Sequence, residues 1–208
     1  MATISDDTEA EGPGRRWALW LQGCPIRCPG CCNPEMFDER AGTAWSLPDL
    51  EARLAAAAER GVEGITLLGG EPFAQAAGAA AVARAAKDRG LTVMVFSGYT
   101  LAELTKLTEH AERADAAPLL ALTDLLVDGP YDRERPEPPP PLGRRWIGST
   151  NQVMHYLTAA YSPDEPRMRA PNTVELHWRD GRLLVNGWPA GADVLAANLR
   201  RGRGQTPS

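Results

Sequence analysis

The sequence contains no run of apolar residues long enough to span a membrane, and residues 1–12 lack the apolar stretch of a secretory signal peptide. It contains no internal repeat either. The formal net charge of −5 offers no overall attraction to nucleic acid. These absences predict a cytoplasmic protein that binds neither membranes nor nucleic acid. The 208 residues are enough for one domain with a sizeable core.

Cysteine is absent from the whole chain except in one loop. All four cysteines lie within residues 23–33, as Cys24, Cys28, Cys31 and Cys32. With no cysteine elsewhere and no export signal, a disulfide is disfavoured and the thiols belong in a reducing compartment. Thiolates bind soft or borderline metals, so their crowding on a short loop indicates either zinc or an iron–sulfur cluster.

The spacing of these cysteines favours the cluster. Neighbouring residues rarely turn both sulfurs toward one centre, so we count Cys24, Cys28 and Cys31 as ligands and leave Cys32 out. A structural zinc ion needs a closed shell of four ligands, usually in two separated pairs, and the chain has no second pair. Three thiolates on a four-iron cluster leave one iron without a protein ligand. The sequence therefore favours an iron–sulfur cluster with a site for a small molecule, and a structural zinc loop is the alternative.

Apolar runs alternate with helical patterns along much of the chain. Buried strands are expected at residues 17–22, 65–68, 92–96 and 124–127. Helices are expected between Ser46, as the N-cap, and Gly61, over residues 73–88, and from about Thr100, where Glu103 completes a capping box. This alternation is typical of an α/β fold with parallel strands and right-handed crossovers.

A motif rich in glycine or polar residues follows each expected strand. The motifs are the cysteine loop, Gly69-Gly70-Glu71-Pro72, Ser97-Gly98-Tyr99 and Asp128-Gly129-Pro130-Tyr131. In a parallel sheet the carboxyl ends of the strands lie at one edge, where active sites gather. We therefore expect the functional site at that edge.

The pattern becomes irregular after residue 131. A proline-rich stretch at residues 135–142 predicts an extended surface segment, and a polar turn precedes a helix expected near residues 153–160. Residues 173–178 and 183–185 flank Asp180-Gly181 and predict a β-hairpin, with His177 as a strand side chain. The expected organisation is a loose tail (1–12), an α/β domain (13–160), a hairpin extension (161–200) and a second tail (201–208).

Together, the motifs resemble a known family. The Cys-x3-Cys-x2-Cys loop after the first strand, with Gly-Gly-Glu-Pro after the second, resembles the radical S-adenosylmethionine superfamily. More narrowly, residues 28–33, 95–101, 126–130 and 148–152 are similar to the small activating enzymes of anaerobic ribonucleotide reductase. Pyruvate formate-lyase activating enzyme is a larger cousin. The resemblance covers about residues 12–152 and implies a partial, open β/α barrel of parallel strands.

The resemblance implies a cofactor and a reaction. Cys24, Cys28 and Cys31 each ligate one iron of a [4Fe-4S] cluster, and the amino and carboxylate groups of S-adenosylmethionine chelate the fourth. An electron, from a donor such as flavodoxin or ferredoxin, cleaves the ligand into methionine and a 5′-deoxyadenosyl radical, which abstracts hydrogen from a substrate. The implied partner is a protein, either a glycyl-radical enzyme or a peptide. No further catalytic side chain is assigned.

The same resemblance assigns the contacts to S-adenosylmethionine. They fall on Gly69, Gly70, Glu71, Ser97, Asp128 and Asn151. The first three meet the amino group through backbone and carboxylate contacts, and glycine suits this task because nothing projects from it. Ser97 lies where the superfamily often contacts the ribose or methionine moiety.

Two departures from the family leave alternatives open. Cys32 follows the third ligand, where an aromatic residue or histidine is common, and Gly30 precedes it, where a bulky residue sometimes contacts adenine. Trp17, Trp20 and Trp146 are then candidates for holding adenine, against the simpler interpretation that each packs in the core. The added hairpin leaves open a maturase that acts on another peptide or small molecule. The second class of function is a non-catalytic module that binds zinc or an iron–sulfur cluster.

Overall fold

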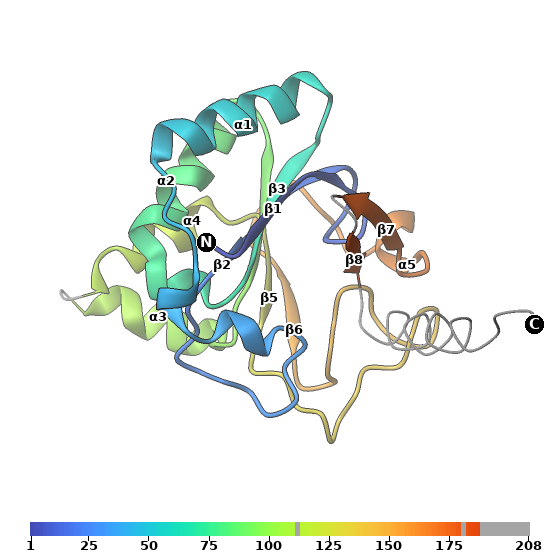
Figure 1. The fold of residues 1–208 in the computed structure, drawn as a ribbon. Helices are drawn as coiled ribbons and strands as arrows, with labels where there is room; N and C mark the ends of the chain where they lie inside the picture. Colours follow the sequence, from blue (N-terminus) through green and yellow to red (C-terminus); the bar gives the residue numbers. More distant parts are fainter. Residues whose placement is uncertain (111–112, 180–181, 188–208) are drawn as a thin grey trace, which may run out of the picture.

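The computed structural model describes residues 1–110, 113–179 and 182–187. Its centre is a six-stranded sheet in the order β1-β2-β3-β4-β5-β6 (Figure 1). The strands are β1 (Thr3–Thr8), β2 (Arg16–Leu21), β3 (Gly64–Gly69), β4 (Thr92–Phe96), β5 (Leu125–Asp128) and β6 (Val153–Tyr156). The four central strands are parallel, and β1 and β6 run antiparallel to them at the two edges. The predicted α/β class with parallel strands is confirmed. Among the described residues the sheet is open, so the expected barrel is not confirmed.

Helices cover one face of this sheet. They are α1 (Leu47–Glu59), α2 (Ala76–Lys87), α3 (Leu101–Glu109) and α4 (Ala116–Leu122), all on the same side in Figure 1. Three short 3₁₀ turns accompany them: η1 (Pro34–Met36), η2 (Glu39–Ala41) and η3 (Pro72–Gln75). The predicted caps are confirmed, because Ser46 accepts a hydrogen bond from the N–H of Asp49 and Thr100 forms a capping box with Glu103.

The largest part of the core lies between the sheet and these helices. Trp17 and Leu19 of β2 point to this side and pack in one cluster with Ile65 of β3. Helix α2 contributes buried alanines, whose small side chains let the helix lie close to the sheet. Because side chains alternate along a strand, Ala18 and Trp20 point to the other face and join a separate apolar cluster. The cysteine loop follows β2 at the carboxyl edge of this second face.

The loose N-terminal tail predicted for residues 1–12 is wrong for much of its length. Residues Thr3–Thr8 form β1, which pairs antiparallel with β2. The two aspartates of this strand have cationic partners: Asp6 lies 2.7 Å from Arg53, and Asp7 pairs with Arg15. An edge strand tolerates charged side chains, which is why its acidic sequence has the composition of a tail.

The helix predicted near residues 153–160 is also wrong. Its first residues form β6, which pairs with β5. A strand of four residues is too short to show a distinguishing period, and tertiary pairing decides its structure. The helix predicted over residues 73–88 is divided between η3 and α2, and α4 has no counterpart among the predicted elements.

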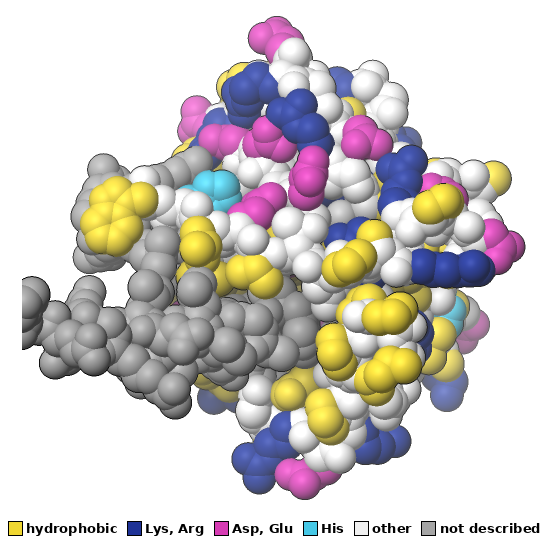
Figure 2. All heavy atoms as spheres, turned by 90° about the vertical axis from the view of Figure 1, so that its right-hand side faces the viewer, with side chains coloured by type: hydrophobic (Ala, Val, Ile, Leu, Met, Phe, Trp, Pro, Cys, Tyr) yellow, Lys and Arg dark blue, Asp and Glu magenta, His cyan; other side chains and the backbone are white. Residues whose placement is uncertain are grey.

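The C-terminal hairpin is confirmed. Strand β7 (Val174–Arg179) pairs antiparallel with β8 (Arg182–Gly187) as a separate sheet, and His177 is a strand side chain as expected. The hairpin and α5 (Pro166–Arg169) lie on the side of the main sheet away from the helices (Figure 1). Hydrophobic and charged side chains are both exposed on this side of the molecule (Figure 2).

Some predictions concern residues that the structure does not describe or boundaries that it does not test. The Asp180-Gly181 turn and the tail predicted for residues 201–208 lie outside the described residues. The domain boundaries expected at residues 13, 160 and 200 stay predictions. Within the part of the chain that the structure describes, no helix is long and apolar enough to cross a membrane.

Candidate metal centre and ligand site

The cysteine loop begins where β2 ends, and its base is held from both sides. The side-chain amide of Gln22 donates to the carbonyl oxygens of Glu35 and Asp38, each at 2.8 Å. The N–H of Gly23 donates to the carbonyl of Met36 at 2.9 Å. The returning chain of η1 and η2 therefore fixes the start of the loop, and this role of Gln22 could not be predicted from the sequence.

The thiols differ in exposure. Cys24, Cys28 and Cys31 are half-buried free thiols, and Cys32 is exposed. Gly30, at φ 79°, turns the chain between the second and third cysteines, and the N–H of Cys31 donates to the carbonyl of Cys28 at 3.1 Å. No group of three or more His, Cys, Asp or Glu among the described residues is gathered as for a single metal ion. Free thiols gathered on one short loop are the donor chemistry of an iron–sulfur cluster, so the residues present fit such a group.

Backbone N–H groups point at two of the sulfurs. Asn33 N–H donates to the Sγ atom of Cys31 at 3.4 Å, and the backbone of Tyr131 donates to Cys28. Burial raises the pKa of the Cys28 thiol, and the hydrogen bond from Tyr131 opposes this shift. A hydrogen bond from Cys32 lowers the pKa of Cys31 to about 6, and the same contact raises the pKa of Cys32. Hydrogen bonds to sulfur also tune the potential of an iron–sulfur cluster.

The two glycines after β3 lie directly against the end of β2. Gly69 has φ +96°, and a Cβ atom placed there meets the Cβ of Trp20 at 2.7 Å. A Cβ atom on Gly70 meets the carbonyl oxygen of Gly23 at 2.3 Å. The N–H of Gly70 donates to Leu21, and the next N–H donates to Gly23. The packing of two strand ends therefore requires these glycines, which is a reason independent of any ligand.

We expect the substitution Gly70→Ala to destabilise the protein by about 1–3 kcal/mol, the usual cost of overpacking. The added methyl group collides with backbone atoms of Gly23, which cannot rotate away as a side chain can. Thermal unfolding of the purified variant measures the effect. Gly78→Ala is the matched control, because nothing lies within 4 Å of a Cβ atom at that position of α2. Equal stability of wild type and Gly70→Ala contradicts the close approach of the two strand ends.

Glu71 joins two of the strand-end motifs. Its Oε1 atom accepts hydrogen bonds from Phe73 N–H at 2.9 Å and from the Ser97 hydroxyl at 3.0 Å, and its Oε2 atom accepts from Gly98 N–H at 2.8 Å. The residue is 1% exposed, and burial raises the pKa of its carboxyl to about 7. Both oxygens thus accept hydrogen bonds from the protein. The predicted contact between this carboxylate and the ligand's amino group stays a prediction.

The end of β4 also contacts the cysteine loop. A Cβ atom on Gly98 meets the Cδ1 atom of Ile26 at 2.6 Å, so this glycine provides room for an apolar side chain of the loop. Ser97 is buried, and its hydroxyl oxygen accepts from Tyr99 N–H at 3.1 Å while the hydroxyl donates to Glu71. The structure therefore brings the cysteine loop and the motifs after β3 and β4 together, as the strand order predicts.

The two remaining candidates for ligand contacts, Asp128 and Asn151, differ in their hydrogen-bond partners. Asp128 is buried, and its carboxylate contacts Leu101 N–H at 2.5 Å, Val153 N–H at 3.2 Å and the His155 ring at 2.9 Å. These contacts fix the starts of α3 and β6. Asn151 instead donates to the Pro130 carbonyl at 2.7 Å, and its buried Oδ1 atom has no partner among the described residues. Only Asn151 keeps an open acceptor, and the ligand contact of Asp128 stays a prediction.

The three tryptophans lie in different layers. Trp17 is fully buried beneath the helices, and its indole N–H donates to Asp6, so the core interpretation is correct for this residue. Trp20 lies on the opposite face with Met36. Trp146 is on that face too, stacked 4.1 Å from the Arg145 guanidinium. An adenine contact remains a prediction for the latter two.

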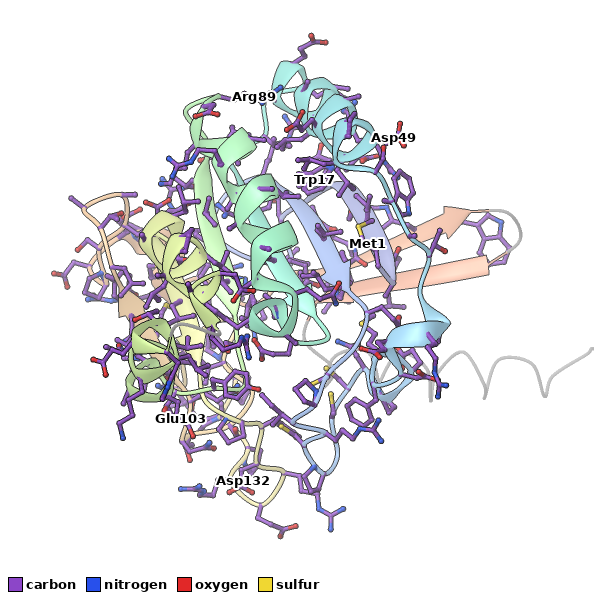
Figure 3. The ribbon with its side chains drawn as sticks, turned by 90° about the vertical axis from the view of Figure 1, so that its left-hand side faces the viewer. Met1, Trp17, Asp49, Arg89, Glu103 and Asp132 are labelled. Carbon is purple, nitrogen blue, oxygen red and sulfur yellow. The ribbon has the colours of Figure 1, made fainter. Side chains whose placement is uncertain are left out.

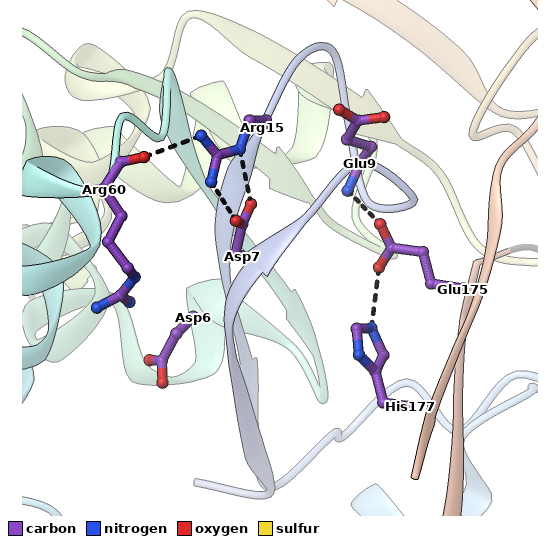
Figure 4. A pocket seen from close by; sticks show the side chains of 7 residues that line it. All are labelled: Asp6, Asp7, Glu9, Arg15, Arg60, Glu175 and His177. Atoms are coloured by element: carbon purple, nitrogen blue, oxygen red, sulfur yellow. Dashed lines mark hydrogen bonds and ion pairs between the residues drawn. The ribbon is translucent and has the colours of Figure 1, made fainter.

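A hollow of about 540 Å³ lies away from the cysteine loop, between β1 and β7 (Figure 4). Acidic residues dominate its lining, but they have partners: Asp7 pairs with Arg15, and Glu175 accepts from Thr8 at 2.6 Å and from Glu9 N–H at 2.7 Å. This hollow is a polar seam that attaches the hairpin to β1. It contains none of the predicted site residues.

This chain is similar to a known protein family and to several named proteins. A family model described as "4Fe-4S single cluster domain" matches residues 10–155. An anaerobic ribonucleoside-triphosphate reductase-activating protein of Vibrio cholerae is 30% identical over 71% of this chain and 91% of its own length. The protein of that name from Salmonella typhi is 29% identical over 70% of this chain and 91% of its own, and the one from Enterobacteria phage T4 is 24% identical over 68% and 83%. The hairpin of β7 and β8 lies beyond the matched residues.

Proposed function

Because the chain belongs to the 4Fe-4S single cluster domain family and to the family of the anaerobic ribonucleoside-triphosphate reductase-activating proteins, we propose that it is a radical S-adenosylmethionine enzyme that cleaves S-adenosylmethionine to activate a protein partner. The name of the relatives supports an anaerobic ribonucleoside-triphosphate reductase as that partner. In this reaction a glycine of the partner loses a hydrogen atom to the 5′-deoxyadenosyl radical. The reaction consumes one electron, and its products are methionine, 5′-deoxyadenosine and a glycyl radical on the partner.

The observation that carries this proposal is the junction of the cysteine loop with two strand-end motifs. Glu71 N–H donates to Gly23 at the base of the loop, and its carboxylate accepts from Gly98. Ile26 of the loop contacts Gly98 in turn. A cluster and its ligand bound at this junction are held by the ends of three adjacent strands. This support provides the precise positioning that radical chemistry needs.

The cysteine loop supplies the metal ligands in this proposal. Cys24, Cys28 and Cys31 each bind one iron as thiolates, and one iron is left for the ligand. When bound, the cluster supplies the electron that breaks the sulfonium carbon–sulfur bond. The N–H groups of Tyr131 and Asn33 donate to the sulfurs and so bear on the potential at which that electron is delivered.

The strand ends supply the contacts to S-adenosylmethionine. The Gly70 carbonyl accepts no hydrogen bond from the described residues, which supports it as an acceptor for the amino group. Asn151 has its open Oδ1 acceptor, and Ser97 has a hydroxyl fixed by Glu71. Trp20 and Phe96 belong to the apolar layer of the same sheet face, which keeps water away from the reacting centre.

Anaerobic reconstitution with iron and sulfide tests the proposal. We expect a brown protein that, reduced with dithionite, converts S-adenosylmethionine into 5′-deoxyadenosine. Addition of an anaerobic ribonucleoside-triphosphate reductase then produces a glycyl-radical signal in electron paramagnetic resonance. A colourless zinc protein, or a cluster that leaves S-adenosylmethionine intact, overturns the proposal.

Cys32→Ala is expected to leave the cluster intact. Cys32 is exposed, and its neighbour Cys31 already supplies a thiolate at this point of the loop. Iron content and the yield of 5′-deoxyadenosine therefore stay within about twofold of wild type, because removing an exposed side chain without a ligand role costs little. Loss of iron from this variant shows that Cys32 belongs to the ligand set in place of another cysteine.

The alternatives are not equally supported. The match to a 4Fe-4S family and to activating proteins argues against a non-catalytic zinc module. A maturase acting on another peptide remains a second prediction, motivated only by a hairpin outside the matched residues. An electron donor such as flavodoxin or ferredoxin, and a cytoplasmic location, also remain predictions.

A further inference from the structure

A proline-rich segment projects at the same edge of the sheet as the cysteine loop. We call residues 132–144 the proline arm; they follow β5 and precede the turn into β6. Its exposed apolar residues are Pro136, Pro138, Pro139, Pro141 and Leu142. Leu142 is 87% exposed, the highest value among the large hydrophobic residues of the described chain. None of these residues is among the proposed ligands of the cluster or the proposed contacts of S-adenosylmethionine.

The arm is built to keep its shape. The Glu137 side chain is only 5% exposed, and its carboxylate accepts from the Arg144 guanidinium at 2.9 and 2.7 Å, which lowers the pKa of Glu137. The N–H of Glu137 donates to Gly148 at 3.1 Å, and Pro136 forms a β-bridge with Ser149. A preformed surface loses little conformational entropy on binding, so its exposed apolar side chains are suited to docking.

The arm also begins in direct contact with the metal centre. Tyr131, the residue before it, donates to the sulfur of Cys28. A Cβ atom on Gly30 meets the Cδ atom of Arg133 at 3.2 Å. In Figure 3, Asp132 lies at the lower edge of the molecule, and Arg89, which precedes β4, lies at the opposite edge. A protein bound to the arm is therefore beside the mouth of the proposed site.

The hairpin offers a second exposed apolar surface, but at the other edge. Trp178 of β7 is 71% exposed. Glu175 of the same strand attaches to Thr8, and Thr8 pairs with Arg16, the first residue of β2. The hairpin therefore lies near the amino ends of the parallel strands, whereas the cysteine loop follows their carboxyl ends. The surface beside the chemistry is the arm.

We propose that the proline arm is the docking surface for the protein whose glycine is activated, with Leu142 and the exposed prolines entering an apolar, aromatic-lined groove of that protein. Rigid proline-rich segments are typically recognised by such grooves because they present an apolar surface at little entropic cost, and here the turn at residues 140–143 presents Leu142 at the end of the segment. This inference rests on the proposed function, and it adds the place and the chemistry of the partner contact.

The test compares Leu142→Ser with Trp178→Ser in the reconstituted enzyme. The probe is a purified anaerobic ribonucleoside-triphosphate reductase of the same organism, and its dissociation constant is measured by anaerobic biolayer interferometry. We expect Leu142→Ser to raise this constant at least about tenfold, as loss of a docking anchor does, and Trp178→Ser to leave it unchanged. Production of 5′-deoxyadenosine with dithionite and no partner is expected to be equal in all three proteins, because both residues lie on the surface.

Three other outcomes overturn the inference. An unchanged constant in Leu142→Ser, or an equal rise in Trp178→Ser, shows that the arm has no special role. A defect seen only when reduced flavodoxin replaces dithionite assigns the arm to the electron donor instead. Because binding is measured separately from catalysis, tight arm-dependent binding without cleavage of S-adenosylmethionine refutes the proposed function and retains the docking surface.

Discussion

Replacing Cys28 with alanine is expected to abolish both assembly of the cluster and cleavage of S-adenosylmethionine. The proposed site has three thiolates, and the fourth cysteine of the loop, Cys32, is hydrogen-bonded to Cys31 and is not counted as a ligand. Loss of Cys28 leaves two irons without a protein ligand. It also removes the sulfur that accepts from Tyr131. We expect iron content and 5′-deoxyadenosine to fall to background after reconstitution, with the same result for Cys24→Ala and Cys31→Ala.

This outcome must be separated from a failure to fold. The core between the sheet and the helices contains no cysteine, so thermal unfolding of the metal-free Cys28→Ala variant is expected to match that of metal-free wild type. A Cys28→Ala protein that keeps a full complement of iron, or that still cleaves S-adenosylmethionine, shows that the ligand set is wrong.

Glu71→Gln is expected to lower the rate of S-adenosylmethionine cleavage by about 10²-fold, the usual effect of misplacing a reacting group by about an ångström. The carboxylate now accepts three hydrogen bonds, from Phe73, Ser97 and Gly98. A glutamine amide has one oxygen and one NH₂ group, so its NH₂ group faces a donor and one bond is lost. The end of β4 then moves relative to the cysteine loop. Steady-state kinetics measure this as a higher KM for S-adenosylmethionine together with a lower kcat.

The same variant has a signature in stability. Burial raises the pKa of the Glu71 carboxyl from 4.5 to about 7, so the folded state binds a proton more readily than the unfolded chain does. The free energy of unfolding therefore falls as the pH rises from about 4.5 to about 7, by on the order of 3 kcal/mol for this group. Arg113, whose charge opposes the shift, limits the effect. Glutamine does not titrate, so Glu71→Gln is expected to flatten this part of the pH profile of thermal unfolding.

An equal slope in wild type and Glu71→Gln shows that the carboxylate is not buried as described. The control is Glu103→Gln, in the capping box of α3 at the surface, where the pKa is lowered instead. Removal of the Glu103 carboxylate is expected to change the free energy of unfolding at pH values above the ordinary pKa of the carboxyl. Cleavage of S-adenosylmethionine is expected to stay unchanged in this variant.

The strands that position the site could be predicted because they are buried on both faces. The runs around Leu67 and Val95 read as continuous apolar segments, and the predicted bounds differ from β3 and β4 by at most two residues. Because these strands are parallel, their carboxyl ends lie at one edge of the sheet. The meeting of the motifs that follow them could therefore be predicted from the topology. The caps at Ser46 and Thr100 could be predicted for a similar reason, since a cap depends only on residues a few positions apart.

What the sequence could not provide depends on contacts between distant residues. β1 became a strand through pairing with β2, against its acidic local composition, and β6, too short to show a period, became one through pairing with β5. The approach of Gly70 to Gly23 is visible only once the two strand ends are side by side. Likewise, Tyr131 was part of a predicted motif, but its hydrogen bond to Cys28 joins residues far apart in the chain.

The proposed function depends most on an open iron in a cluster held by three thiolates. The direct measurement is electron paramagnetic resonance of the reduced, anaerobically reconstituted protein, recorded before and after addition of S-adenosylmethionine. We expect a [4Fe-4S]⁺ signal whose g values shift when the ligand is added, because its amino and carboxylate groups bind the cluster itself. A spectrum that S-adenosylmethionine leaves unchanged, from a cluster with four protein ligands, contradicts the account.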